Sequence, residues 1–211
     1  MTANEISEIR AAIAGERKDL ADIVTGLPEP IWDQPTLCAG WRVREVVAHM
    51  TMPFRYSSGR FMLEMVTSRG NFNKMADRLA RRDAAALSTG ELASSLADNI
   101  DHPWKPPGGG FQGALSHDVI HGMDITVGLG LDRRVPESRL RMVLDGLTPR
   151  GVKFFGVDLA DVRLCADDLD WSYGSGAPLS GAASDLLLVL CGRRLPTGRL
   201  RGEPAGRFSV A

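Results

Sequence analysis

The sequence lacks a large net charge, a long apolar run and a paired-cysteine motif. Its 211 residues carry a formal charge of −1, so the chain does not have the basic character that attracts nucleic acids and anionic membrane surfaces. The longest apolar run, residues 186–191, is far shorter than the ~20 residues that span a bilayer. We therefore expect neither nucleic acid nor a membrane as a partner.

Cysteine is also scarce. Cys38, Cys165 and Cys191 are widely spaced and form no CxxC pair, which argues against a disulfide framework or a thiolate zinc site and favours reduced, structural thiols. The first 20 residues are charged throughout and lack the apolar core of a signal peptide. We therefore expect a cytoplasmic protein. The excess of arginine over lysine, 21 to 4, is typical of a GC-rich bacterial genome.

Helical periodicity dominates the first 150 residues. Apolar residues recur at helical spacing, and a kink is expected at Pro53 within the second helix. The stretch at 73–86 is typical of a polar surface helix, and Thr89 is the expected N-cap of the helix after it. The expected helices cover residues 3–26, 42–65, 73–86, 89–100, 111–127 and 136–147.

The pattern changes after Pro149. Apolar and polar residues alternate on both sides of Asp167 and Asp168, which predicts a β-hairpin over 162–173. A helix capped by Ser180 and a last strand in GRFSV should follow. The predicted fold is thus mainly α, with a four-helix bundle in residues 1–150 and a small α/β domain in residues 151–211.

Two of the four histidines lie in SHDVIHGMD, residues 116–124. On an α-helix His117 and His121 occupy the same face, and Asp124 continues it. Asp118 points about 100° away from His117 and is a poor ligand for the same ion. Because a catalytic zinc-type centre takes three protein ligands and keeps one position open, a third ligand must come from elsewhere.

His49 is the natural third ligand, since it lies in the apolar stripe of the second helix and should face the core. Glu45, one turn earlier, could accept a hydrogen bond from an imidazole. His102 follows a helix end, where capping or exposure is the simpler interpretation. The alternative for all three site histidines is that they are ordinary hydrogen-bonded core residues, and spacing alone does not decide between these interpretations.

Three sequence blocks resemble a known family. IWDQPTLCAGWRVREVVAHM, residues 31–50, is similar to the signature of the mycothiol-dependent maleylpyruvate isomerase-like family of the DinB superfamily. VIHGMDITVGLG, residues 119–130, resembles the second signature, with Met123 in the aromatic position. LSGAASDLLLVLCGR, residues 179–193, resembles the third. The blocks occur in the family's order and span most of the chain.

The resemblance implies a DinB-like metal-binding bundle in which His49, His117 and His121 hold a divalent ion, zinc in the first place and nickel as an alternative. It also implies a low-molecular-weight thiol such as mycothiol. The expected activity is that of a thiol S-transferase or isomerase acting on a small electrophile. His117 departs from the isomerase branch, which has Glu at the matching position, so the resemblance does not extend to maleylpyruvate as the substrate.

Other residues have weaker assignments. Asp124 could orient an imidazole or bind a water, and Arg55, Tyr56 and Arg60, expected beyond His49 on the same helix, could meet a carboxylated substrate. Two alternatives remain open: a hydrolase in which the metal activates water, and a non-catalytic metal- or ligand-binding stress protein. The expected partners are the small-molecule thiol and the electrophile, with a second copy of the chain as a further candidate.

Overall fold

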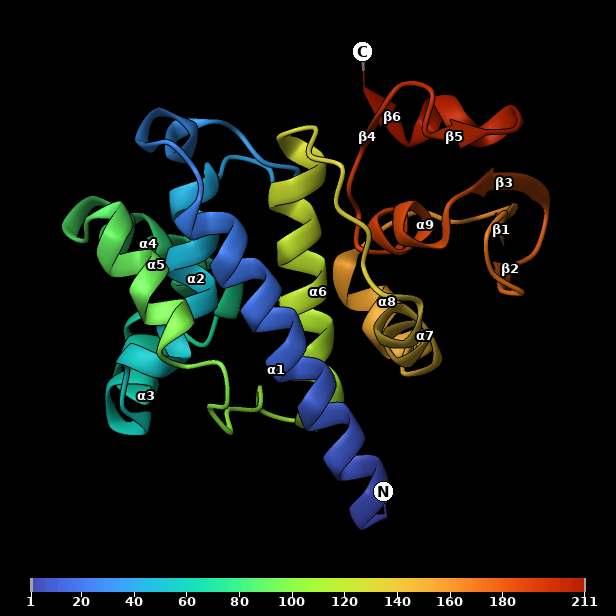
Figure 1. Ribbon diagram of the computed structural model, residues 1–211. Coiled ribbons are helices and arrows are strands. Elements are labelled where there is room, and N and C mark those ends of the chain that lie inside the picture. The colour runs from blue at the N-terminus through green and yellow to red at the C-terminus, as the bar shows by residue number, and fades with distance from the viewer. Residues whose placement is uncertain (1, 211) are drawn as a thin grey trace. The chain divides into compact units, whose positions relative to one another are not determined.

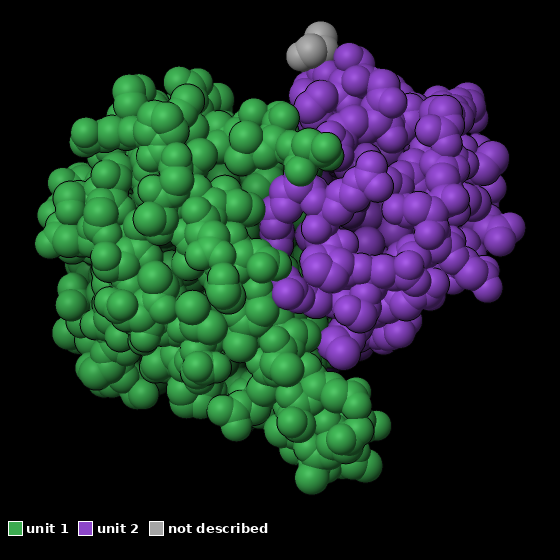
Figure 2. Space-filling view, in the orientation of Figure 1, with its two compact units in different colours: residues 1–132 green, residues 133–211 purple. Residues whose placement is uncertain are grey.

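The computed structural model describes residues 2–210. The chain divides into two compact units, residues 1–132 and 133–211 (Figures 1 and 2). The sequence pattern places this division at residue 150, whereas the helices between 133 and 155 lie in the second unit instead of the bundle. One of them, α7, packs against α9 of that unit, which accounts for the earlier boundary.

The first unit is helical (Figure 1). Helix α1 contacts α5 and α6, and α2 contacts the same two helices, which closes a ring of four. The predicted four-helix bundle is confirmed. A further helix, α4, packs against α2 outside this ring. The elements are α1 (Ala3–Thr25), a short 3-10 helix η1 (Glu29–Asp33), α2 (Val43–Arg55), α3 (Ser58–Thr67), α4 (Phe72–Ala86), α5 (Thr89–Ala97) and α6 (Gly110–Gly128).

Three details of these helices differ from the prediction. The second helix continues past Pro53 but ends at Arg55 instead of residue 65, because Tyr56 is extended and the Ser57 side chain caps a separate helix, α3. The cap of α5 is Ser88 instead of Thr89: its hydroxyl accepts the Glu91 N–H. Helix α4 is not a surface helix throughout, since one side is buried against the bundle through Met75, Ala76, Leu79, Ala80 and Ala84.

The second unit carries a small mixed sheet in the order β2-β1-β3-β5. The predicted hairpin forms, with Leu164 opposite Tyr173, and β3 pairs with β1 in parallel. Ser180 belongs to β3 and not to a helix cap; the Asp168 carboxylate instead accepts the first N–H of α9, at Ala183. The elements are α7 (Glu137–Asp145), α8 (Pro149–Phe155), β1 (Val162–Ala166), β2 (Ser172–Gly174), β3 (Ala177–Gly181), α9 (Ala183–Leu190), β4 (Leu195–Pro196), β5 (Leu200–Arg201), η2 (Glu203–Arg207) and β6 (Ser209–Val210).

The expected last strand is β6, which pairs in parallel with β4. The apolar run in α9 is buried and forms the centre of this unit's core. Among the described residues, no helix has both the length and the apolar composition needed to cross a membrane.

Candidate metal centre

Three histidines meet in the interior of the bundle. His49 comes from α2, and His117 and His121 come from successive turns of α6. One ring nitrogen of each lies within 4.8 Å of the other two, and the Nε2 atoms of His117 and His49 are 3.2 Å apart. His49 is 6% exposed, and the side chains of His117 and His121 are 15% and 14% exposed. The structure thus brings together the three residues that the sequence singled out.

A buried carboxylate and a buried arginine lie behind His117. The Asp118 Oδ1 atom is 2.9 Å from His117 Nδ1, and its Oδ2 atom accepts a 2.8 Å hydrogen bond from Arg17 Nε. Arg17, on α1, is completely buried. It also donates to the backbone carbonyls of Asn99 and His102. Asp118 therefore lies behind the His117 ring and connects it to Arg17, an arrangement that was not predicted from the sequence.

His121 has its own carboxylate. Asp124 Oδ2 is 3.0 Å from His121 Nδ1, and the Asp124 side chain is completely buried. The backbone carbonyl of Asp124 accepts the Leu37 N–H at 3.0 Å. Asp124 therefore connects α6 both to a site histidine and to the segment that precedes α2.

That segment, residues 34–42, is a tight turn against α6. The Thr36 N–H and hydroxyl both donate to the Trp41 carbonyl, and the Trp41 N–H donates to the Cys38 carbonyl. The turn approaches α6 at Gly128, where a Cβ atom would stand 2.8 Å from Thr36 Cα. A glycine is needed at this position because any side chain would push the turn away. Cys38, at the tip of the turn, is held near His121 and Asp124.

Two tryptophans flank the histidines. The Trp41 ring is 5.0 Å from that of His49, and its indole N–H donates to Asp77 at 2.8 Å. The Trp104 ring lies 5.1 Å from that of His117. The place of Trp104 beside His117 was not predicted from the sequence; the available signal was an aromatic residue in a loop rich in proline and glycine.

Glu45 does not support an imidazole. Its carboxylate instead accepts hydrogen bonds from the Arg42 backbone and guanidinium at the start of α2. Burial would raise the pKa of Glu45, but the hydrogen bonds and charge of Arg42 outweigh it and lower the pKa. Glu45 thus caps the start of α2 by accepting the backbone N–H of Arg42, the N-cap residue.

Arg60 lies on α3, and not on the helix of His49. Its guanidinium stacks 4.0 Å from the centre of the Tyr56 ring, and the Tyr56 hydroxyl donates to Asp83. Arg55 also binds Asp83, and it donates to the Ala48 carbonyl. These residues form a cluster between α2, α3 and α4. Arg55 and Arg60, which were expected to meet a carboxylated substrate, instead contact residues of this cluster.

His102 has no place among the ligands. Its Nδ1 atom accepts the Trp104 N–H at 3.2 Å, and its ring packs against Phe54. Burial, and then the positive charge of Arg17, lower its pKa. His102 therefore orders the loop that carries Trp104.

The donor set fits a divalent metal ion. Ligating histidines commonly direct the second ring nitrogen to a carboxylate, and both α6 histidines have this arrangement here. The carboxylates accept from Nδ1–H, so the lone pairs remain on the Nε2 atoms. The three imidazoles can converge on one ion and leave a position open.

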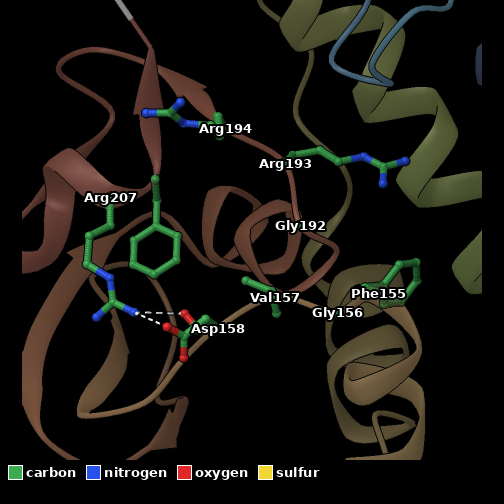
Figure 3. Close-up of a pocket in the computed structure, with 9 residues that line it drawn as sticks. Phe155, Gly156, Val157, Asp158, Gly192, Arg193, Arg194 and Arg207 are labelled. Atoms are coloured by element: carbon green, nitrogen blue, oxygen red, sulfur yellow. Dashed lines mark hydrogen bonds and ion pairs between the residues drawn. The ribbon is translucent and has the colours of Figure 1, made fainter.

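The second unit contains a shallow depression of about 270 Å³ with three arginines in its lining (Figure 3). Arg207 bonds Asp158, and Arg193 points away from this pair in the view. Arg194 and Arg193 donate to the backbone carbonyls of Ser209 and Cys191. Each of these arginines bonds a nearby backbone carbonyl or carboxylate of the same unit. The depression is therefore a weaker candidate for a functional site than the three histidines.

Comparison with known proteins agrees with the sequence signatures. Residues 13–102 match the model of the mycothiol maleylpyruvate isomerase N-terminal domain, and no curated protein matches the chain significantly. Two crystal structures share the fold over the whole chain and 98% of their own length, each at 12% identity. They are the mycothiol-dependent maleylpyruvate isomerase, with a TM-score of 0.57, and a histidine-to-alanine mutant of it, with a TM-score of 0.62. Residues 13–102 are thus similar to the mycothiol maleylpyruvate isomerase N-terminal domain, and the chain shares the fold of the mycothiol-dependent maleylpyruvate isomerase.

Proposed function

We propose that the protein is a divalent-metal-dependent enzyme that uses a low-molecular-weight, mycothiol-like thiol and either conjugates this thiol to a small electrophile, as an S-transferase, or isomerises the electrophile. Zinc is the proposed metal and nickel the alternative. The observation that carries the proposal is the convergence of His49, His117 and His121 within 4.8 Å. The family match at residues 13–102 supports the thiol.

A divalent ion in this set would supply Lewis acidity that lowers the pKa of a thiol in the open position and so favours thiolate at neutral pH. The three imidazoles are neutral ligands, so they leave the double positive charge of an ion uncompensated. The carboxylates of Asp118 and Asp124 fix the tautomers of His117 and His121. Their negative charges lie behind the rings, where they strengthen the histidines as donors without occupying the open position.

The tryptophans set the surroundings of the open position. Trp41 is 9% exposed and held in place by Asp77, so it forms a fixed apolar wall beside His49. Trp104 forms the corresponding wall beside His117. Such walls exclude water from the reacting thiol and electrophile, which strengthens electrostatic effects there.

Metal analysis of protein purified without a polyhistidine tag, combined with a thiol-binding titration, tests the proposal. The protein should hold about one divalent ion per chain. His121→Ala should lose it, whereas His102→Ala, the matched control outside the ligand set, should keep it. Conversion of a model electrophile should require both the ion and the thiol.

The alternatives give different results. Metal-dependent hydrolysis that needs no thiol would favour a hydrolase, and metal binding without thiol affinity or turnover would favour a binding protein. Stoichiometric metal in the His49, His117 and His121 triple alanine variant would refute the ligand assignment itself.

A further inference from the structure

We propose that Cys38, His121 and Asp124 form a second set of metal ligands, suited to a thiophilic divalent ion, which competes with the three-histidine set for His121. One ligand atom from each of the three residues lies within 4.8 Å of the others. The proposal concerns metal binding alone and does not require the catalytic activity proposed above.

The second set would use the ring nitrogen of His121 that faces Asp124. His121 Nδ1 is the atom that faces Asp124, at 3.0 Å from Oδ2. A neutral imidazole has one lone pair, which lies on Nδ1 or on Nε2 according to the tautomer. The three-histidine set needs it on Nε2, with Nδ1–H donated to Asp124. An ion between Cys38 and Asp124 needs it on Nδ1, so one chain can fill only one of the two sets.

The position of Cys38 is fixed by the turn that carries it. The Cys38 N–H donates to the Thr36 hydroxyl at 3.2 Å, and the adjacent Leu37 N–H donates to the Asp124 carbonyl at 3.0 Å. Gly128 permits the backbone of the turn to lie directly on α6. The turn therefore presents the thiol to the Asp124 and His121 side chains without a conformational search, which reduces the entropic cost of binding an ion.

The ligand chemistry distinguishes the two sets. The first offers three neutral nitrogens, whereas the second offers a sulfur, a nitrogen and a carboxylate oxygen. As the ion binds, the Cys38 S–H proton passes to solvent and a metal–sulfur bond forms, so the second set carries two negative charges against a divalent cation. Thiolate is a soft ligand that selects soft or borderline ions. The second set should therefore prefer Cd²⁺, and the first should bind Co²⁺ or Ni²⁺ well.

Cadmium titration followed by ultraviolet absorption tests this proposal, because Cd²⁺ bound to thiolate gives a charge-transfer band that imidazole ligands do not. The wild-type protein should develop the band with about one equivalent of Cd²⁺. Cys38→Ser should abolish it, and Cys165→Ser, the control for an unrelated thiol, should not. A His49→Ala/His117→Ala double variant, whose fold is checked by circular dichroism, should keep the band because it retains the second set.

Competition tests the sharing of His121. Pre-bound Co²⁺ should be displaced from the wild-type protein by Cd²⁺, and Cys38→Ser should weaken that displacement at least about tenfold, in line with the loss of one strong ligand. A band that persists in Cys38→Ser, or no band in the folded wild-type protein, would overturn the proposal. Neither result bears on thiol-dependent turnover, so this proposal and the proposed function can fail separately.

Discussion

Arg17 offers a sharp test of how the metal centre is supported. Its guanidinium is completely buried and donates to Asp118 and to the Asn99 and His102 carbonyls. Arg17→Met keeps most of the side-chain stem but removes every donor. Asp118, with a side chain 2% exposed, would then be a buried carboxylate without its cation. Breaking such a pair from one side costs about 3–5 kcal/mol.

Urea unfolding of the metal-free protein, followed by circular dichroism, measures this cost. Lys18→Met is the matched control, since Lys18 pairs with Asp22 on the same helix and both side chains are more than half exposed. An exposed pair of this kind, four residues apart on one helix, contributes little to stability. The two variants should therefore differ by several kcal/mol. A cost for Arg17→Met within about 1 kcal/mol of the control would refute the inference that the buried pair stabilises the bundle.

The same pair should act on metal affinity through His117. Asp118→Asn keeps the shape of the side chain but removes the negative charge that would make the His117 imidazole a stronger metal ligand. We expect metal affinity to fall about 10–100-fold, measured by competition with a chromophoric chelator. A double-mutant cycle with Arg17→Met should show strong coupling in stability, because a neutral amide at position 118 leaves no buried charge without its partner.

Two further predictions concern the surroundings of the site. Gly128→Ala should lower the free energy of unfolding in urea by about 1–3 kcal/mol, because its Cβ would stand 2.8 Å from Thr36 Cα. The control Gly59→Ala, with no atom within 4 Å of its Cβ, should be neutral or stabilising. Equal effects of the two substitutions would contradict the close packing of the turn on α6. Since the pKa of His102 is lowered below 6.5 by burial and then by Arg17, the unfolded chain binds that proton more tightly, so stability should fall as pH drops below about 6.5. His102→Gln should reduce this fall, measured as unfolding free energy between about pH 7.5 and 5, and an unchanged slope would contradict it.

The three candidate metal ligands could be predicted from sequence because their pattern is local. His117 and His121 are four residues apart on one helix, and His49 lies in an apolar stripe, so helix geometry alone turns each toward the bundle interior. His102 could be set aside because it follows the end of the helix expected at residues 89–100. The bundle itself followed from the apolar periodicity of α1, α2, α5 and α6.

The features that the sequence did not predict depend on contacts between distant segments. Arg17 and Asp118 are 101 residues apart, and nothing in either local sequence signals a buried pair. The same holds for β3, whose parallel pairing with β1 depends on a partner outside its own segment. The break between α2 and α3 escapes prediction for a different reason: apolar residues continue at helical spacing past Pro53, and the extended Tyr56 that separates the helices leaves this periodicity intact.

The two α6 histidines are positioned by different parts of the bundle, although they lie one turn apart. His117 depends on Asp118 and, through it, on α1; His121 depends on Asp124 and, through its backbone, on the turn before α2. Loss of Arg17 should therefore loosen the position of the His117 side chain and leave that of His121 unchanged. A substitution at Gly128 that disturbs the turn should loosen His121 and leave His117 unchanged. The same turn also carries Cys38. His121, the residue that the two proposed metal sets would share, is therefore supported by the segment that supplies the thiol of the second set.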